Sequence, residues 1–194
     1  AYAKYLKGAK EHYAAEECKV DVLNNGASSQ IDLFEPEEKY PYVVIEDFNT
    51  IGLVGDIAKD YTNEKKKPPY YRFFWSENQS EKGEGTRGKW GIGKVVFPIA
   101  SRLRTFFAYS VRAGESPREI LCGKALLSYH TVGGERYSAD GWWGCQKNGE
   151  SMPETDAGAI AAFKADFNVA RKDELGLTVV VPCVKELDWI EMQR

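Results

Sequence analysis

The segment TFFAYSVRAGESPREILCGKALLSYH, residues 105–130, decides the fold class. Its two ends, 105–112 and 119–130, are rich in aromatic and aliphatic residues and flank the turn sequence GESP at 114–117. This pattern predicts two long strands that form a hairpin. Because consecutive strands with no helix between them argue against a doubly wound parallel sheet, the segment predicts an α+β protein.

The sequence on either side of this hairpin predicts the rest of one sheet and its helices. Strands are indicated where β-branched runs end at turn residues, and helices where apolar residues recur every three or four positions. The further expected strands are 28–34, 42–45 and 177–181, and the expected helices are 3–17, 94–103 and 156–167. Together they predict a two-layer sandwich in which helices cover one face of a mixed, largely antiparallel sheet.

The composition limits the class of protein. The chain has 194 residues, 26 basic and 29 acidic side chains, and a net charge of −3. This length suits one domain, and the balanced charge excludes an obligate polycation of the histone type. No apolar run approaches the roughly 18 residues of a membrane span, and the start of the chain does not resemble a signal peptide. The four cysteines lie too far apart in sequence for paired zinc ligands, so free thiols and a cytoplasmic location are expected.

A glycine-rich segment, residues 83–94, matches two common nucleotide-binding patterns. Residues 88–94 spell GxxxxGK, the P-loop pattern, but Val95 stands where a P-loop has Ser or Thr, and no apolar strand precedes the segment. Residues 83–88 spell GxGxxG, but the βαβ unit of a dinucleotide-binding fold is missing around them. Both patterns therefore fail in their context.

The same segment still has the physical properties of an anion site. Glycines allow backbone N–H groups to approach an anion closely, and Lys94 lies where a helix is expected to begin. Between residues 85 and 114 there are six basic residues and no acidic one. This pattern favours an anion such as a triphosphate; the alternative is a surface loop with solvated charges.

Two segments, IEDFNTIGL at 45–53 and GKWGIGK at 88–94, resemble the GHKL ATPases, the Bergerat-fold group of gyrase B, MutL, heat-shock chaperones and histidine kinases. The resemblance is strongest to a bacterial branch of uncharacterised GHKL-like proteins with DFNTTGL and GIGK boxes. It implies that the Asp47 carboxylate accepts a hydrogen bond from the amino group of adenine, and that Gly52 makes room for the base. Asn49 stands where the family has its first glycine, and Asn tolerates the same left-handed backbone.

The resemblance also assigns the glycine segment and the last expected strand. Thr178, in GLTVVVP at 176–182, would support Asp47 through a water molecule. A mobile lid would span about 59–93, and the expected cofactors are ATP and Mg²⁺. The triphosphate would be held by Gly88, Gly91, Ile92, Gly93 and Lys94.

The family's first box is a helix with a catalytic Glu and, four residues later, a magnesium-binding Asn. Glu17 and Asp21 have this spacing, which places two side chains on one face of a helix. They are the candidate catalytic and metal residues within this sequence. The alternative is that the true pair precedes Ala1, in which case this chain is a fragment that lacks the N-terminal part of the domain.

The resemblance therefore predicts a single ATP-binding domain over residues 1–194. It implies slow Mg²⁺-dependent ATP hydrolysis, coupled to lid closure and to association with another protein domain or subunit, for example as an ATP-dependent dimer. Nucleic acid would be reached only through the partner, and no membrane contact is expected. The alternatives are phosphotransfer of the histidine-kinase type, or a nucleotide-sensing or DNA-associated module without catalysis.

Two aromatic groups and one histidine have open interpretations. The block YYRFFW at 70–75 predicts either a core segment or lid hinge, or a surface that stacks on nucleobases. Trp142 and Trp143 predict either a partner surface or a packed strand edge. His130 is a candidate base, but no nucleophile motif accompanies it.

Overall fold

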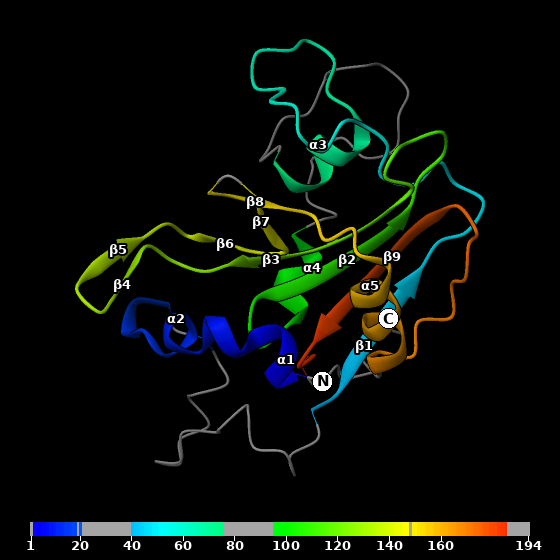
Figure 1. Cartoon of the computed structure of the whole chain (residues 1–194). Coiled ribbons are helices and arrows are strands. Elements are labelled where there is room, and N and C mark those ends of the chain that lie inside the picture. Colours follow the sequence, from blue (N-terminus) through cyan, green and yellow to red (C-terminus); the bar gives the residue numbers. More distant parts are fainter. Residues whose placement is uncertain (1, 19, 21–39, 76–94, 148, 186–194) are drawn as a thin grey trace, which may run out of the picture.

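The computed structural model describes residues 2–18, 20, 40–75, 95–147 and 149–185. Its centre is a five-stranded sheet with the strand order β1-β9-β2-β3-β6, and each neighbouring pair is antiparallel (Figure 1). Two small hairpins, β4–β5 and β7–β8, extend from it. The strands are β1 (Tyr42–Glu46), β2 (Thr105–Val111), β3 (Glu119–Leu126), β4 (His130–Val132), β5 (Glu135–Tyr137), β6 (Asp140–Trp143), β7 (Cys145–Lys147), β8 (Glu150–Met152) and β9 (Gly176–Pro182).

The helices are short, and they are spread along the chain, before, between and after the strands of the sheet. They are α1 (Tyr2–Leu6), α2 (Lys10–Ala14), α3 (Pro69–Phe74), α4 (Val96–Ala100) and α5 (Ala157–Asp166), with 3-10 turns η1 (Lys7–Ala9) and η2 (Glu16–Cys18). The expected α+β class and largely antiparallel sheet are confirmed. The expected strand at 28–34 lies outside the described residues.

The hairpin predicted from residues 105–130 forms the middle of the sheet. β2 and β3 pair from Thr105 opposite Ala125 to Val111 opposite Glu119. The strand expected to reach residue 130 ends at Leu126, and His130 begins β4. β1, β9 and α5 also lie where the sequence predicts them.

One face of the sheet packs against α1, α2 and α5. Because side chains alternate along a strand, Phe107 and Tyr109 of β2 both point to this face. Phe107 meets the rings of Tyr5 and Phe163 edge to face at 5.9 and 5.5 Å between ring centroids. Tyr5 also donates a hydrogen bond to Asp166 at 2.7 Å, which ties α1 to the end of α5.

The opposite face is covered as well, which differs from the one-sided cover expected from the sequence. Phe106 and Ala108 of β2 pack there with Phe74 of α3, while Phe97 of α4 packs against the edge of this cluster. Every residue of β2 is buried. A strand that is apolar on both sides requires cover on both sides, and the aromatic block at 70–75 supplies it.

Two predicted helices are shorter or more broken than expected. The helix expected over 3–17 is divided into α1, η1, α2 and η2, with Gly8 near its middle. Glycine weakens a helix interior because it loses the most backbone freedom on folding. The helix expected to reach residue 103 ends at Ala100, and Ser101 turns into extended backbone that pairs with Val184.

Candidate functional site

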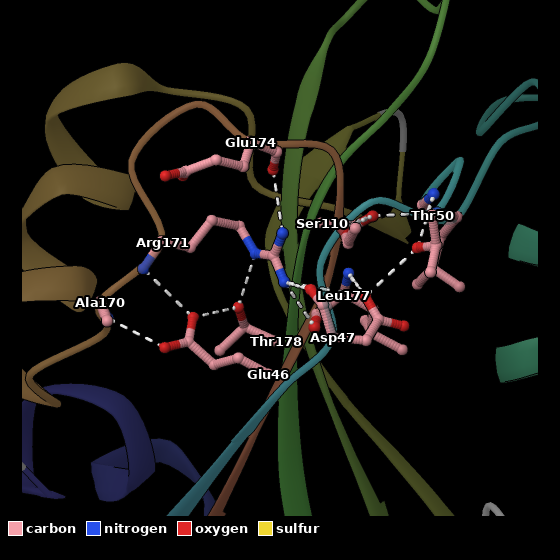
Figure 2. A network of polar contacts seen from close by, with 12 residues as sticks. Glu46, Asp47, Thr50, Ser110, Ala170, Arg171, Glu174, Leu177 and Thr178 are labelled. Atoms are coloured by element: carbon pink, nitrogen blue, oxygen red, sulfur yellow. Dashed lines mark hydrogen bonds and ion pairs between the residues drawn. The ribbon is translucent and has the colours of Figure 1, made fainter.

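The candidate site lies where β1 ends, at Asp47. The backbone N–H of Asp47 donates to the Leu177 carbonyl at 3.0 Å, and the Leu177 N–H donates to Asp47 Oδ1 at 2.6 Å (Figure 2). The Thr50 hydroxyl donates to the same oxygen at 3.2 Å. Half of the Asp47 side chain, 50%, is exposed, and Oδ2 has no hydrogen bond among the described residues. One carboxylate oxygen is therefore fixed by the protein, and the other is left to accept a hydrogen bond.

A buried arginine, Arg171, organises the backbone around Asp47. Its side chain is fully buried, and its guanidinium donates to the carbonyl oxygens of Asp47, Glu174 and Leu177, the last two both at 2.9 Å. The nearest guanidinium nitrogen lies 3.7 Å from Asp47 Oδ1. The guanidinium carbon also lies 4.6 Å from the centre of the Phe48 ring, a cation–π contact. Arg171 thus fixes the main chain at the end of β1 and places its positive charge beside the Asp47 carboxylate.

Thr178 belongs to the same network, but it contacts Glu46 rather than Asp47. Its hydroxyl donates to Glu46 Oε1 at 2.8 Å and accepts from Arg171 Nε at 2.9 Å. Glu46 also accepts the backbone N–H groups of Arg171 and Ala170, at 3.2 and 3.0 Å. Thr178 of β9 pairs with Glu46 of β1, and Glu46 is the residue directly before Asp47 in the sequence. Among the described residues, the link from Thr178 to Asp47 therefore runs through the guanidinium of Arg171.

The loop after Asp47 uses two left-handed residues. Asn49 has φ +61°, so the expected tolerance of Asn for this backbone is confirmed. Gly52 has φ +69°, and a Cβ at this position would lie 2.4 Å from the carbonyl oxygen of Val111 and 2.8 Å from Ser110 Oγ. The neighbouring Leu53 N–H donates to Ser110 Oγ at 2.9 Å. Gly52 is thus required for the loop to dock on β2, a reason that the sequence pattern does not reveal.

The structure separates the candidate catalytic residue from Asp47. Glu17 is exposed in η2, which lies against β4. β4 extends from the β3–β6 side of the sheet, whereas β1 forms the opposite edge (Figure 1). The 3-10 turn ends at Cys18, so no described helix carries Glu17 to a partner four residues later. The structure therefore places Glu17 away from Asp47, and its catalytic role stays a prediction; Asp21 lies outside the described residues.

The expected phosphate segment lies outside the described residues as well. This applies to Gly88, Gly91, Ile92, Gly93 and Lys94. The described part of the expected lid, residues 59–75, contains α3, whose Tyr70 and Phe74 are buried against the sheet. α3 is therefore part of the cover of the sheet, and Tyr70 and Phe74 of the block at 70–75 are core residues, while Arg72 and Trp75 are exposed.

The tryptophan pair is packed on both sides of β6. Trp143 meets Tyr5 and Phe107 at 5.6 Å between ring centroids in each case. Trp142 stacks on Trp75 at 4.1 Å. The packed-edge interpretation of this pair is therefore the correct one.

Sequence reasoning did not identify Arg171, Glu46 or Ser110 as parts of this site. Arg171 stands in the segment between α5 and β9 without a motif around it. Glu46 and Ser110 are polar residues inside apolar strand patterns, and this is the one signal that marks them.

Within the described residues, no group of three or more His, Cys, Asp and Glu side chains is placed to hold a metal ion. No helix in the described part of the chain has the length and apolar character needed to cross a membrane. Comparison with protein-family models, curated proteins and solved structures finds no match for this chain. The resemblance to GHKL ATPases is therefore carried by the quoted residues and their order alone.

Proposed function

We propose that this protein binds ATP at the end of β1, with Asp47 as the acceptor for the amino group of adenine. The observation that carries the proposal is the half-exposed carboxylate with one oxygen fixed and one unpartnered among the described residues. A fixed acceptor of this kind suits a ligand that presents an amino group, because an ionised carboxylate can only accept hydrogen bonds.

The surface next to Asp47 supports a planar base as the ligand. Phe48 and Ile51 are large apolar residues that remain 44% and 56% exposed. Arg171 fixes the Phe48 ring from one side by a cation–π contact. A carboxylate beside exposed apolar surface combines the polar and apolar contacts that a nucleobase needs.

The phosphates of the nucleotide are assigned to the glycine segment by the resemblance and by its positive charge. Residues 88–94 offer backbone N–H groups as donors. Lys89 and Lys94 belong to this segment, and Arg87 directly precedes it in the sequence. By the same resemblance, closure of a lid over the nucleotide would couple binding to association with a partner domain or subunit in the cytoplasm.

The described residues do not fit a Mg²⁺ site or a hydrolytic step. Backbone N–H groups bind both carboxylate oxygens of Glu46, and only one oxygen of Asp47 is fixed. Glu17 lies beside β4, on the β3–β6 side of the sheet and away from the β1 edge. This placement of Glu17 favours nucleotide binding without hydrolysis by the described part of the chain. Mg²⁺-dependent hydrolysis would need a glutamate from elsewhere.

The proposal is tested by isothermal titration with non-hydrolysable analogues of ATP and GTP. The ATP analogue is expected to bind at least ~10-fold more tightly, because guanine presents a carbonyl oxygen where adenine presents its amino group. Asp47→Asn is expected to abolish this preference, since the amide replaces the free acceptor oxygen with a donor. Asp173→Asn is the matched control and is expected to bind like the wild type, because Asp173 is an exposed carboxylate between α5 and β9 whose side chain has no hydrogen bond or ion pair among the described residues. Absence of ATP binding, or an unchanged preference in Asp47→Asn, contradicts the proposal.

A further inference from the structure

A second candidate site is a cavity of about 410 Å³ between the N-terminal helices and the β3–β6 side of the sheet. α2 lies along this side, whereas β1, whose end carries Asp47, forms the opposite edge of the sheet (Figure 1). The residues that matter for the argument are Tyr5, His12, Ala125, Tyr137, Gly141 and Trp143, all of which line the cavity.

The cavity exists because the sheet has small residues on this face. Ala125 stands opposite Gly141 in the β3–β6 pairing, and Gly123 stands two residues before Ala125. Directly paired residues and residues two apart share a face of the sheet, so these three lie on one face. Ala125 and Gly141 leave a shallow floor, while the Phe107 ring fills the space beside Gly123. The larger rings of Tyr5 and Trp143, 5.6 Å apart between centroids, form the wall.

The polar end of the cavity is a pair of histidines with a defined arrangement of protons. His130 Nδ1 lies 2.8 Å from the Ser128 carbonyl oxygen, which can only accept, so this nitrogen carries a proton. In the neutral pair, His130 Nε2 is then an acceptor, and His12 Nδ1, 2.8 Å away, is the donor to it. His12 Nε2 is therefore unprotonated, and it has no hydrogen-bond partner among the described residues. The pair presents one free acceptor nitrogen.

We propose that this cavity binds a small planar aromatic molecule that donates one hydrogen bond to His12 Nε2. A cavity of 150 Å³ is enough to hold benzene, so about 410 Å³ accommodates a molecule of two or three rings. Binding sites of this size are generally apolar with a few polar groups that fix orientation. The rings of Tyr5, Tyr137 and Trp143 supply aromatic contacts, and His12 supplies the directional one.

The acceptor is present only while His12 is neutral. Burial and the neighbouring His130 lower the pKa of His12, while Glu11 on the same helix opposes this effect. Once protonated, Nε2 becomes a donor and repels the N–H of the ligand. The charged and titratable groups that line the cavity or neighbour His12 are Lys4, Tyr5, Glu11, Tyr13, Lys124, His130, Tyr137 and Asp140.

The test compares indole, which donates through its N–H, with 1-methylindole, which has the same rings and no donor. Titration calorimetry on the intact protein at a pH of about 8 is expected to give about fivefold tighter binding of indole. The ratio is expected to fall toward one as the pH is lowered through the folded-state pKa of His12, because protonation turns Nε2 from an acceptor into a donor. Neither compound titrates in this range, so the change reports the protein.

Two variants locate the site. His12→Phe keeps a ring in place and is expected to bind both compounds equally, whereas Ala125→Leu fills the floor and is expected to bind neither. Near-ultraviolet circular dichroism establishes that each variant is folded. The comparison of indole with 1-methylindole is made on the wild-type protein, so it tests the proposal even if a variant fails to fold. Failure of indole to bind the wild type, equal binding of the two compounds at high pH, or a preference that persists in His12→Phe overturns the proposal.

Discussion

Arg171 is the residue on which the end of β1 depends. Its guanidinium is fully buried and binds three backbone carbonyls and the Thr178 hydroxyl, while its backbone N–H binds Glu46. A buried charge is tolerated only when its donors are satisfied in this way. The position of Asp47 therefore depends on this network as well as on the local DFNT sequence, in which Thr50 donates to Asp47 Oδ1.

Arg171→Met is expected to lower the free energy of unfolding by about 3 kcal/mol, because the Thr178 hydroxyl and three backbone carbonyl oxygens would lose their donor. Urea denaturation measures the loss. Arg118→Met is the control: Arg118 is exposed and donates to the Asp173 carbonyl, so a change within about 0.5 kcal/mol is expected. Equal losses of unfolding free energy in the two variants would contradict a stabilising role of the Arg171 network.

Gly52 and Gly114 form a matched pair for separating backbone strain from close packing. Both have φ +69°, but a Cβ on Gly52 would lie 2.4 Å from the Val111 carbonyl oxygen, while a Cβ on Gly114 would meet nothing within 4 Å. Gly114→Ala is expected to cost about 1 kcal/mol of stability from strain alone. Gly52→Ala is expected to cost about 3 kcal/mol, since the clash adds to the strain. Similar losses in the two variants, measured by urea denaturation, would contradict the packing role of Gly52.

At the scale of elements, β2 is the strand around which the others assemble. It pairs with β3 on one side and β9 on the other, and it is buried along its whole length. Its odd-numbered side chains contact α1 and α5, and its even-numbered side chains contact α3 and α4. Strand alternation alone thus explains why the helices fall into two groups.

The helix α5 has a side-chain cap that can be tested directly. Asp156 Oδ1 accepts the backbone N–H of Ala159 at 2.8 Å, which satisfies one of the free N–H groups at the start of the helix. Asp156→Ala is expected to lower the free energy of unfolding by about 1 kcal/mol. Thr155→Ala, at the exposed neighbouring position, is expected to change it by less than about 0.5 kcal/mol. Urea denaturation of both variants provides the comparison.

At the scale of the whole molecule, polar contacts join α2 to the start of β2 and to the β4–β5 hairpin. Tyr13 and Thr105 share a buried hydrogen bond of 2.7 Å between their hydroxyls, and His12 binds His130 of β4. Burial raises the pKa of Tyr13 to about 12, so this hydroxyl stays neutral at physiological pH. His12 is the group in this contact that acid can change.

Acidification is expected to weaken the docking of α2. The pKa of His12 is lowered in the folded state below its ordinary value of 6.5 by burial and by His130. The unfolded chain therefore binds its proton first, and this contribution to stability is lost as the pH falls from about 6.5 through the folded-state pKa. The difference in unfolding free energy between a pH of about 7.5 and one of about 5 is expected to be smaller in His12→Phe than in the wild type. An identical pH dependence in both proteins would contradict the assignment.

The sequence by itself determined the elements whose pattern is local. The hairpin at 105–130, β1, β9 and the Asp156 cap of α5 follow from strand runs, turn residues and helix start signals that act over a few positions. Asn49 in a left-handed conformation also follows from residue chemistry. These features need no information from distant parts of the chain.

Only the tertiary structure decided how distant polar groups combine. Arg171 reaches Asp47 across 124 positions of sequence, and His12 meets His130 across 118. It also decided that Glu17 lies away from Asp47 and that Gly52 packs on β2. The physical reason is that both faces of β2 must be buried, and this requirement selects the segments that pack on them. Buried polar groups must then form hydrogen bonds, and this requirement selects their partners. Both requirements arise only once the sheet has formed.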